Sequence, residues 1–258
     1  MLPKQREAEI LSDLDRRGVV TVSDLADRLE VTGETIRRDL IKLEGLGRLV
    51  RTHGGAVAPS ADTVESPFAV RKTDRAKEKR SIGSVAARSV GPGAVIAIDA
   101  STTCLEVARQ LPALDAAETI TVVSNGLDVV RWLSGRRGVE VICTGGEFDA
   151  AGACFVGPIA EATLRRFAFD RAFLSCRGYD DQRGASEASP AHAALKLQML
   201  HQADAAWLLV DSSKIGTRSG CFFAEATAFT TIVSDKPPSA DADSRAASRW
   251  RVAGPIDA

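Results

Sequence analysis

The sequence predicts an α/β protein in two parts, a small helix-turn-helix domain with a wing and a larger domain built on a parallel sheet. Two observations lead to this prediction. Three short amphipathic patterns occupy the first 57 residues, and beyond Gly93 short apolar runs alternate with helical patterns. A chain of 258 residues with 45% hydrophobic content has room for two cores. We expect a helix-turn-helix domain at 1–57, a connector at 58–74, an α/β domain at 75–236 and a partly mobile tail at 237–258.

The first two helices are marked by their ends and by their apolar faces. Gly18 is expected to end the first helix, and Thr21 is expected to cap the second, with Asp24 three residues later as the acidic member of a capping box. The second helix is short, about two turns. The inner faces of the two helices are expected to be Ile10, Leu11 and Leu14, and Leu25, Ala26 and Leu29.

The third helix begins at a hydroxyl cap, Thr32, and places Ile36, Leu40 and Leu43 on one apolar stripe. Only a tight turn fits between Leu29 and Thr32, so the second and third helices should cross steeply, as in a helix-turn-helix. In that geometry the first residues of the third helix enter the major groove of DNA. The polar residues left on its outer side are Thr35, Arg37, Arg38 and Lys42.

A wing is expected beside this helix. The segment 48–55 has apolar residues followed by a glycine pair, which is typical of a short hairpin. An arginine here or on the helix can bond guanine bidentately or neutralise a phosphate, and the sequence leaves both roles open. The wing residues expected to contact DNA are Arg48, Arg51, Thr52, His53 and Gly54.

The charge pattern supports DNA binding only locally. Exposed arginines usually just solvate a helix face, and residues 1–57 contain ten Lys and Arg against ten Asp and Glu. From 33 to 55, however, five cations stand against three acids. We therefore expect a polarised domain whose third helix and wing form the positive side.

Six short apolar runs define the expected parallel sheet of the second domain. In open sheets of this kind, ligands bind at the carboxyl ends of the strands, so the residues after each run are the candidates for a site. The runs are 95–98, 120–123, 139–143, 172–174, 207–210 and 231–233.

The residues after these runs are suited to a phosphorylated ligand. Asp99-Ala-Ser-Thr-Thr-Cys104 places three hydroxyls and free backbone N–H groups at a helix start, which suits phosphate. Lys214 offers a cation, while Asn125 and Asp211 are able to bond sugar hydroxyls. Each piece alone also fits a capped loop or a turn, and Lys196 fits a solvated helix position as well as an inward one. The expected effector-binding residues are Asp99, Ser101, Thr102, Thr103, Asn125, Gly145, Gly146, Lys196, Asp211 and Lys214.

The cysteines and histidines predict neither disulfides nor a metal site. The five cysteines are scattered, without a Cys-x-x-Cys pair, and Cys143 and Cys176 are expected to be small buried residues. His53, His192 and His201 lack the spacing to cysteine that is typical of zinc sites. We therefore expect no metal and no cofactor.

No segment suggests a membrane or an export signal. The N-terminal segment lacks the apolar core of a signal peptide, and no apolar run approaches the roughly 18–20 residues of a membrane span. We expect a cytoplasmic protein with no membrane partner. The charged run 71–80 is expected to be a solvated helix face rather than a phosphate contact.

Several motifs resemble one family. Thr35-Ile-Arg-Arg-Asp-Leu40, Leu43-Glu44 and Arg51-Thr-His-Gly-Gly-Ala56 resemble the winged-helix signature of the DeoR family of bacterial transcriptional regulators. The family usually has serine where Thr32 stands, and Gly33 is an unusual residue in a first turn. Further motifs resemble the sensor half of these regulators: Pro67-Phe68, Asp99-x-Ser-Thr-Thr103, Ser124-Asn125, Gly145-Gly146, Gly157-Pro158, Lys196 and Asp211-Ser-Ser-Lys-Ile-Gly216.

The resemblance implies a Rossmann-like sensor domain related to sugar-phosphate isomerases, with a phosphorylated sugar as effector. It also implies that the candidate residues named above, apart from Asp211, line the effector site. Ser175-Cys-Arg-Gly178 departs from the family pattern and puts Arg177 near that site. We therefore predict a repressor of carbohydrate metabolism genes that binds a double-stranded DNA operator as a homo-oligomer, a dimer or a tetramer.

Two other functions are weighed against this one. In the first, the second domain is an isomerase-like enzyme with Asp99 or Asp211 as the base, but no paired carboxylates are evident for it. In the second, the small domain is an adaptor for protein contacts, which leaves Arg37 and Arg38 without a role. Fusion of the second domain to a DNA-binding module favours sensing over turnover.

Overall fold

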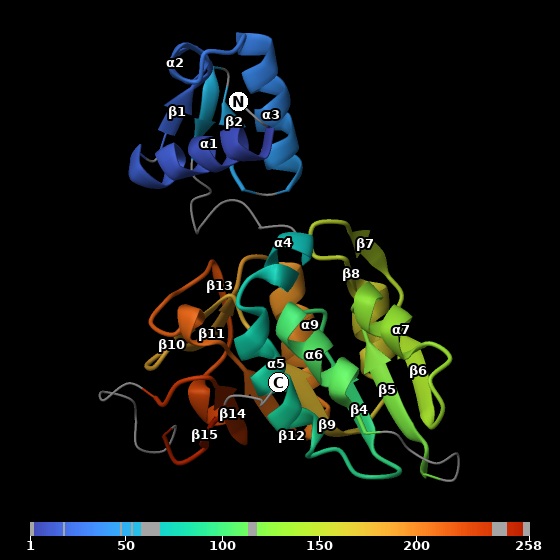
Figure 1. The fold of residues 1–258 in the computed structure, drawn as a ribbon. Helices are drawn as coiled ribbons and strands as arrows, with labels where there is room; N and C mark the ends of the chain where they lie inside the picture. The colour runs from blue at the N-terminus through green and yellow to red at the C-terminus, as the bar shows by residue number, and fades with distance from the viewer. Residues whose placement is uncertain are drawn as a thin grey trace. The chain divides into compact units, whose positions relative to one another are not determined.

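A computed structural model of the chain describes residues 3–17, 19–46, 48–52, 54–57, 68–112, 118–238 and 247–254 (Figure 1). The chain divides into two compact units, residues 1–71 and 72–258. This division lies inside the expected connector 58–74. Of that connector, 58–67 lies outside the described residues, and the remainder contains the helix α4 (Phe68–Thr73).

The first unit has the predicted three helices and wing. Its helices are α1 (Pro3–Arg17), α2 (Val22–Arg28) and α3 (Gly33–Gly45). Its strands are β1 (Val19–Thr21), β2 (Val50–Thr52) and β3 (Gly55–Val57), antiparallel in the order β1-β3-β2. The hairpin of β2 and β3 confirms the predicted wing, whereas β1 was not predicted. A Cβ atom on Gly55 would lie 1.9 Å from the Val20 carbonyl oxygen, so glycine is what lets β1 approach β3.

The helix starts and inner faces of this unit also agree with the sequence prediction. The Thr21 hydroxyl accepts a hydrogen bond from the Asp24 N–H (3.2 Å), and the Thr32 hydroxyl accepts one from the Thr35 N–H (3.3 Å). Ile36 of α3 is fully buried in a core that the three helices and the wing share. The other members of this core include Ile10, Leu14, Leu25, Leu40, Leu43 and Leu49.

The second unit is built on a seven-stranded parallel sheet in the order β15-β14-β12-β9-β4-β5-β6. All six predicted strands are present. The seventh, β15, comes from the segment 237–258 that was expected to be a tail. The bounds are β4 (Val95–Ile98), β5 (Ile120–Ser124), β6 (Val139–Cys143), β9 (Phe169–Leu174), β12 (Ala203–Leu209), β14 (Thr231–Ser234) and β15 (Trp250–Val252).

The strand order creates a topological switch point between β4 and β9. The chain runs from β4 through β5 to β6, and then returns to the other side of β4 to add β9, β12, β14 and β15. Ligands of open α/β sheets bind in the crevice outside the carboxyl ends of the strands at such a point. The order therefore confirms the Rossmann-like prediction. It places Asp99 and Ser175, which directly follow β4 and β9, at the switch point.

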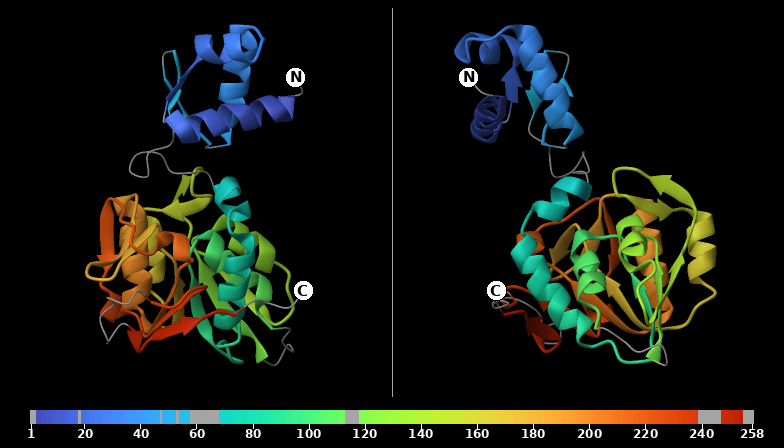
Figure 2. Two further views of the ribbon diagram at one scale, coloured as in Figure 1. Left: turned by 60° about the vertical axis from the view of Figure 1, so that its left-hand side comes forward. Right: turned by 45° about the vertical axis from the view of Figure 1, so that its right-hand side comes forward.

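Helices cover both faces of the sheet. Figures 1 and 2 show α5, α6 and α7 on one face and α8 and α9 on the other. Two small antiparallel sheets, β7-β8 and β10-β11-β13, were not predicted because their strands have only three or four residues. The helix bounds are α5 (Ala76–Ala87), α6 (Thr102–Gln110), α7 (Leu127–Leu133), α8 (Pro158–Leu164) and α9 (Pro190–His201), with short 3-10 helices η2 (Ser212–Lys214) and η3 (Ala226–Ala228). The small strands are β7 (Glu147–Asp149), β8 (Cys154–Val156), β10 (Gly178–Asp180), β11 (Gly184–Glu187) and β13 (Cys221–Ala224).

Two local expectations are wrong. Cys143, expected to be buried, is exposed because it ends the edge strand β6, while Cys176 is buried as expected. The charged run 71–80 is not simply solvated, since Lys79 is buried and donates to the Asp74 carbonyl (2.6 Å). No helix in the described ranges is both long enough and apolar enough to span a bilayer.

Candidate functional site

The predicted DNA-contacting residues that the structure describes lie on the outside of the first unit. Arg37, Arg38 and Lys42 are exposed on α3, and Arg48 and Arg51 are exposed at the wing. Thr32 is exposed at the helix cap, where its hydroxyl lies 2.9 Å from that of the half-buried Thr35. His53 and the side chain of Thr52 lie outside the described residues, and Gly54 accepts a hydrogen bond from the Val22 N–H (2.8 Å) at the hairpin turn.

Three of these five cations are paired within the unit. Arg37 lies 3.5 Å from Glu34, Lys42 lies 2.6 Å from Glu7, and Arg51 lies 3.6 Å from Glu44. Among the described residues of the unit, no carboxylate is within ion-pair distance of Arg38 or Arg48. These two guanidinium groups are therefore the ones most available to a nucleic acid, because no internal partner has to be displaced first.

The helix that presents Arg38 is fixed from behind by a buried ion pair. Asp39 points into the unit and is bonded to Arg6 of α1, with 3.1 Å between Arg6 Nη2 and Asp39 Oδ1. Both side chains are buried, so the pair holds α3 in one orientation against α1. Neither residue was given a role from the sequence. Asp39 directly follows Arg37 and Arg38, which are exposed, and nothing in the sequence distinguishes it from them.

In the second unit, the residues at the switch point of the sheet are organised around Asp99. Its carboxylate accepts hydrogen bonds from the N–H groups of Ser101 (2.7 Å) and Ser175 (2.7 Å), and it is ion-paired with Lys196 of α9. Lys196 also donates to the Ser175 carbonyl (2.8 Å) and lies 3.1 Å from Glu187 of β11. Asp99, Lys196, Ser175 and Glu187 are all buried.

Lys196 and Asp99 hold each other in the ionised state. Burial alone would lower the pKa of Lys196, but the carboxylates of Asp99 and Glu187 outweigh it, and the pKa is raised. Burial would likewise raise the pKa of Asp99, but the charge of Lys196 and the hydrogen bonds to the carboxylate lower it. One ammonium between two carboxylates leaves the cluster with a net negative charge.

The start of α6 provides the expected phosphate-type donors. The Ser101 hydroxyl caps the helix by accepting from the Cys104 N–H (3.0 Å), so it is already engaged. The N–H groups of Thr102 and Thr103 have no acceptor among the described residues, although both side chains are buried. These two N–H groups lie at the positive end of the α6 dipole.

Asn125 is held between the sheet and the β7-β8 hairpin. Its backbone oxygen accepts from the Phe155 N–H (2.8 Å) and its side-chain amide donates to the Phe155 carbonyl (3.1 Å). The side-chain oxygen of Asn125 is buried and has no hydrogen-bond partner in the described part of the chain. A buried acceptor without a partner is costly, so this oxygen is suited to a hydroxyl donor from a ligand.

The loop after β12 is held by Arg75 rather than left free. Arg75 has a left-handed backbone (φ +50°) at the start of α5 and lies 3.2 Å from Asp211 and 3.0 Å from Asp235. Asp211 also accepts from the Ser213 N–H (3.1 Å), while Asp235 accepts from the Ser212 N–H (2.6 Å). Asp211 is therefore engaged in fixing the loop, and the neighbouring Lys214 is half-exposed.

The structure thus brings together only some of the predicted effector residues. Asp99, Ser101 and Lys196 form one bonded cluster, with Thr102 and Thr103 beside it. Asn125, Gly145 and Gly146, and Asp211 and Lys214 follow β5, β6 and β12 at the same edge of the sheet. The sequence gave no role to Glu187 or Arg75, and Ser175 was named only within the motif that departs from the family pattern. The available signal for Glu187 was an acid in a run of small residues, and for Arg75 it was a charged run just after the connector.

Comparison with known proteins identifies the same two units. A family model described as DeoR-like helix-turn-helix domain matches residues 6–62, and one described as DeoR C terminal sensor domain matches residues 74–236. The chain is 36% identical to the L-fucose operon activator of Haemophilus influenzae, over 90% of the chain and 91% of the relative. It is 32% identical to the transcriptional repressor AccR of Agrobacterium fabrum, over 90% of the chain and 89% of the relative. Among solved structures, ribose 5-phosphate isomerase A of Methanocaldococcus jannaschii aligns with a TM-score of 0.38 and 15% identity, covering 53% of each chain.

The buried cluster leads to a prediction about stability. Replacing Lys196 with methionine should destabilise the protein by about 3–5 kcal/mol, because it leaves two buried carboxylates without a counter-charge. Urea unfolding followed by circular dichroism measures the change. The matched control is Lys77→Met on the exposed face of α5, which should change stability by less than about 0.5 kcal/mol.

The loss caused by Lys196→Met should shrink at acid pH, because the Asp99 carboxylate, whose pKa Lys196 holds down in the parent, becomes protonated and needs no counter-charge. An equal loss at neutral and acid pH would show that Lys196 contributes through packing and not through its charge.

Proposed function

Since the chain belongs to the DeoR family of transcriptional regulators, we propose that it represses genes of carbohydrate metabolism and is controlled by a phosphorylated sugar. The proposed operator contacts are made by α3 and the wing, and the proposed effector site is the crevice at the carboxyl edge of the parallel sheet. One observation carries the proposal. Arg38 is exposed without an internal ion-pair partner, and it lies on α3, which the buried Arg6–Asp39 pair fixes from behind. The site of action is then the cytoplasm, where the operator is.

The DNA contact is supported by how α3 is presented. Asp39 is tied to Arg6 inside the unit, so the adjacent Arg38 projects from a helix whose orientation is already set. A preorganised donor loses less entropy on binding than one on a mobile segment. Arg48 at the wing is the second uncompensated cation, and it is suited to a phosphate beside the groove.

The effector contact is supported by two kinds of unsatisfied group. The N–H groups of Thr102 and Thr103 offer donors to a phosphate, and Lys214 offers a charge. The buried oxygen of Asn125 offers an acceptor to a sugar hydroxyl. A phosphorylated sugar carries both an anion and hydroxyl donors, so it satisfies both kinds at once.

An isomerase function is disfavoured by the state of Asp99. A general base needs a free lone pair and a pKa tuned toward neutrality. The Asp99 carboxylate instead accepts from two backbone N–H groups and is paired with Lys196, and its pKa is lowered. Such a carboxylate is a weak base. We therefore propose that the crevice binds its sugar phosphate without turning it over.

We propose that Arg75 couples the effector site to the DNA-binding unit. It fixes the loop that carries Lys214, and it lies four residues from the boundary between the two units. An effector that moves this loop must break or rearrange the bonds of Arg75. In a homo-oligomer, two DNA-binding units would meet half-sites about 34 Å apart, so a change in their spacing would alter affinity.

The first prediction concerns Arg38. Arg38→Ala should weaken binding to an operator selected from random DNA by about 1–3 kcal/mol with relaxed specificity if the side chain contacts a base. If it contacts a phosphate, binding should fall uniformly across sequences and the salt slope should drop by about 1. Fluorescence anisotropy over a salt series distinguishes the two. Lys42→Ala, whose ammonium is already paired with Glu7, is the matched control and should lose less. Parent-like affinity of Arg38→Ala would remove the residue from the interface.

The second prediction concerns Lys214. Lys214→Ala should bind a phosphorylated sugar found by thermal-shift screening about 10- to 150-fold more weakly, since bonds to charged groups contribute about 1.5–3 kcal/mol. Operator affinity without the sugar should stay unchanged. Calorimetry measures the sugar, and the exposed Lys236→Ala is the control. Parent-like sugar binding by Lys214→Ala would contradict the assigned role.

The third prediction concerns Arg75. Coupling of about 1–3 kcal/mol corresponds to a 5- to 150-fold effect of the sugar on operator affinity. Arg75→Lys keeps the charge but loses the planar fork, so this ratio should fall toward one while each ligand still binds alone. Anisotropy with and without the sugar measures the ratio. Arg80→Ala, exposed on the same helix, should keep it. An unchanged ratio in Arg75→Lys would exclude this route of coupling.

A further inference from the structure

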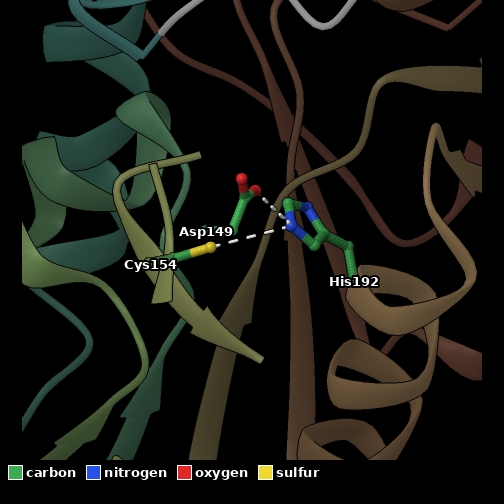
Figure 3. A group of neighbouring side chains, drawn as sticks. All are labelled: Asp149, Cys154 and His192. Carbon is green, nitrogen blue, oxygen red and sulfur yellow. Dashed lines mark hydrogen bonds and ion pairs between the residues drawn. The ribbon is translucent and has the colours of Figure 1, made fainter. Parts of the chain in front are cut away.

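A second group of chemically active side chains lies apart from the cluster at Asp99. Asp149 ends β7, Cys154 begins β8, and His192 lies in the first turn of α9. One ligand atom from each of these three residues lies within 4.8 Å of the other two. Figure 3 shows the carboxylate and the thiol both directed at the imidazole ring. Cys154 is buried, and Asp149 and His192 are half-buried.

The separations match those of ligands around one small metal ion. His192 Nε2 lies 3.7 Å from Cys154 Sγ and 3.0 Å from Asp149 Oδ2. Tetrahedral zinc, with bonds of about 2.0–2.3 Å, places neighbouring ligand atoms roughly 3.3–3.6 Å apart. Both separations from His192 lie within a few tenths of an ångström of these values, and the third pair of ligand atoms lies within 4.8 Å.

The same geometry disfavours a catalytic triad. In a triad, the histidine uses one ring nitrogen for the nucleophile and the other for the carboxylate. Here the thiol and the carboxylate both face Nε2. Three donors that converge on one point form a coordination site, whereas a proton relay needs them in line.

The β7-β8 hairpin fixes one of the three ligands by hydrogen bonds, as is usual for metal ligands. Asp149 accepts hydrogen bonds from the N–H groups of Ala151 and Gly152 (3.1 Å each), which fixes its carboxylate. A Cβ atom on Gly152 would lie 2.7 Å from Asp149 Oδ2 and 2.9 Å from Cys154 Sγ. Only glycine at this position leaves the space between the ligands open. The next residue, Ala153, has a left-handed backbone (φ +50°), so the turn accepts strain just before Cys154.

We propose that Asp149, Cys154 and His192 bind a divalent metal ion of the zinc class, with one coordination position left for water or a ligand oxygen. A thiolate, an imidazole and a carboxylate together suit zinc better than magnesium or calcium, which prefer oxygen donors. The sequence analysis expected no metal, because Cys154 and His192 are 38 residues apart and show no motif spacing.

The three residues lie near the residues proposed to bind the effector. His192 and Lys196 are four residues apart on α9, so their side chains lie on the same face of the helix. Asn125, whose side-chain oxygen is without a partner, contacts Phe155 next to Cys154. The metal is therefore expected beside the residues proposed to bind the sugar, although its binding does not depend on that proposal.

The test measures metal binding by the full-length protein. Metal-free protein is titrated with Zn²⁺ against a chromophoric chelator, and with Co²⁺ to detect thiolate-to-cobalt charge transfer in the ultraviolet. The parent should bind one ion per chain. Cys154→Ser and His192→Gln should bind zinc at least about 100-fold more weakly. Loss of a residue that only supports a ligand already weakens metal binding by up to about 100-fold, and loss of a ligand should cost no less. The controls Cys143→Ser and His201→Gln, which remove an exposed cysteine and an exposed histidine, should bind like the parent.

Specific outcomes would overturn the proposal. They are a parent protein that takes up no stoichiometric zinc at micromolar concentrations, or Cys154→Ser and His192→Gln variants that bind as the parent does. Rapid alkylation of Cys154 in the metal-free protein that depends on His192 would indicate a proton relay instead. If either variant fails to fold by circular dichroism, Asp149→Asn, at a half-buried position, replaces it with the same expected loss. None of these readouts uses DNA or sugar, so they fail or succeed independently of the proposed function.

Discussion

The buried ammonium of Lys196 is the interaction on which the geometry of the larger unit depends. It joins Asp99 after β4, the Ser175 carbonyl after β9 and Glu187 of the small sheet to one helix, α9. A buried charge is tolerated only when its partners are in place, so these four elements have one satisfactory arrangement. That arrangement lies at the switch point of the sheet, where the candidate effector residues follow the strands.

The candidate effector residues at this edge of the sheet also differ in charge. The carboxylates of Asp99 and Glu187 make this cluster an acceptor of hydrogen bonds, which suits the hydroxyl groups of a sugar. The α6 start and Lys214 are positive in character and suit the phosphate. A sugar phosphate would then be oriented by electrostatics, with its anion toward α6 and its hydroxyls toward Asn125 and the cluster. Lys196, which the sequence suggested as a ligand contact, acts first as a structural charge.

The sequence predicted the two-part architecture and six of the seven strands of the parallel sheet, and from these the edge of the sheet where the candidate site is sought. Periodicity located all six strands that it proposed, and hydroxyl caps located the starts of α2 and α3. It was insufficient wherever a long-range partner decides the role of a residue. Lys196 and Asp99 are 97 residues apart, and Arg75 and Asp235 are 160 apart. Cys143 differs for another reason, since an apolar strand looks the same from sequence whether it is central or at an edge.

The proposed coupling between effector binding and DNA binding would be effective because of how charge is distributed in the first unit. Because three of its five candidate cations are paired internally, each unit has few charges left for the phosphate backbone, and nonspecific affinity rises with the number of phosphates neutralised. One unit alone should therefore bind DNA weakly. Two units joined in an oligomer gain affinity only when their spacing matches the operator, because avidity is lost when geometry forbids simultaneous contact. If Arg75 couples effector binding to the DNA-binding unit as proposed, a modest displacement of the loop it holds would change operator occupancy without any change in the DNA-contacting residues themselves.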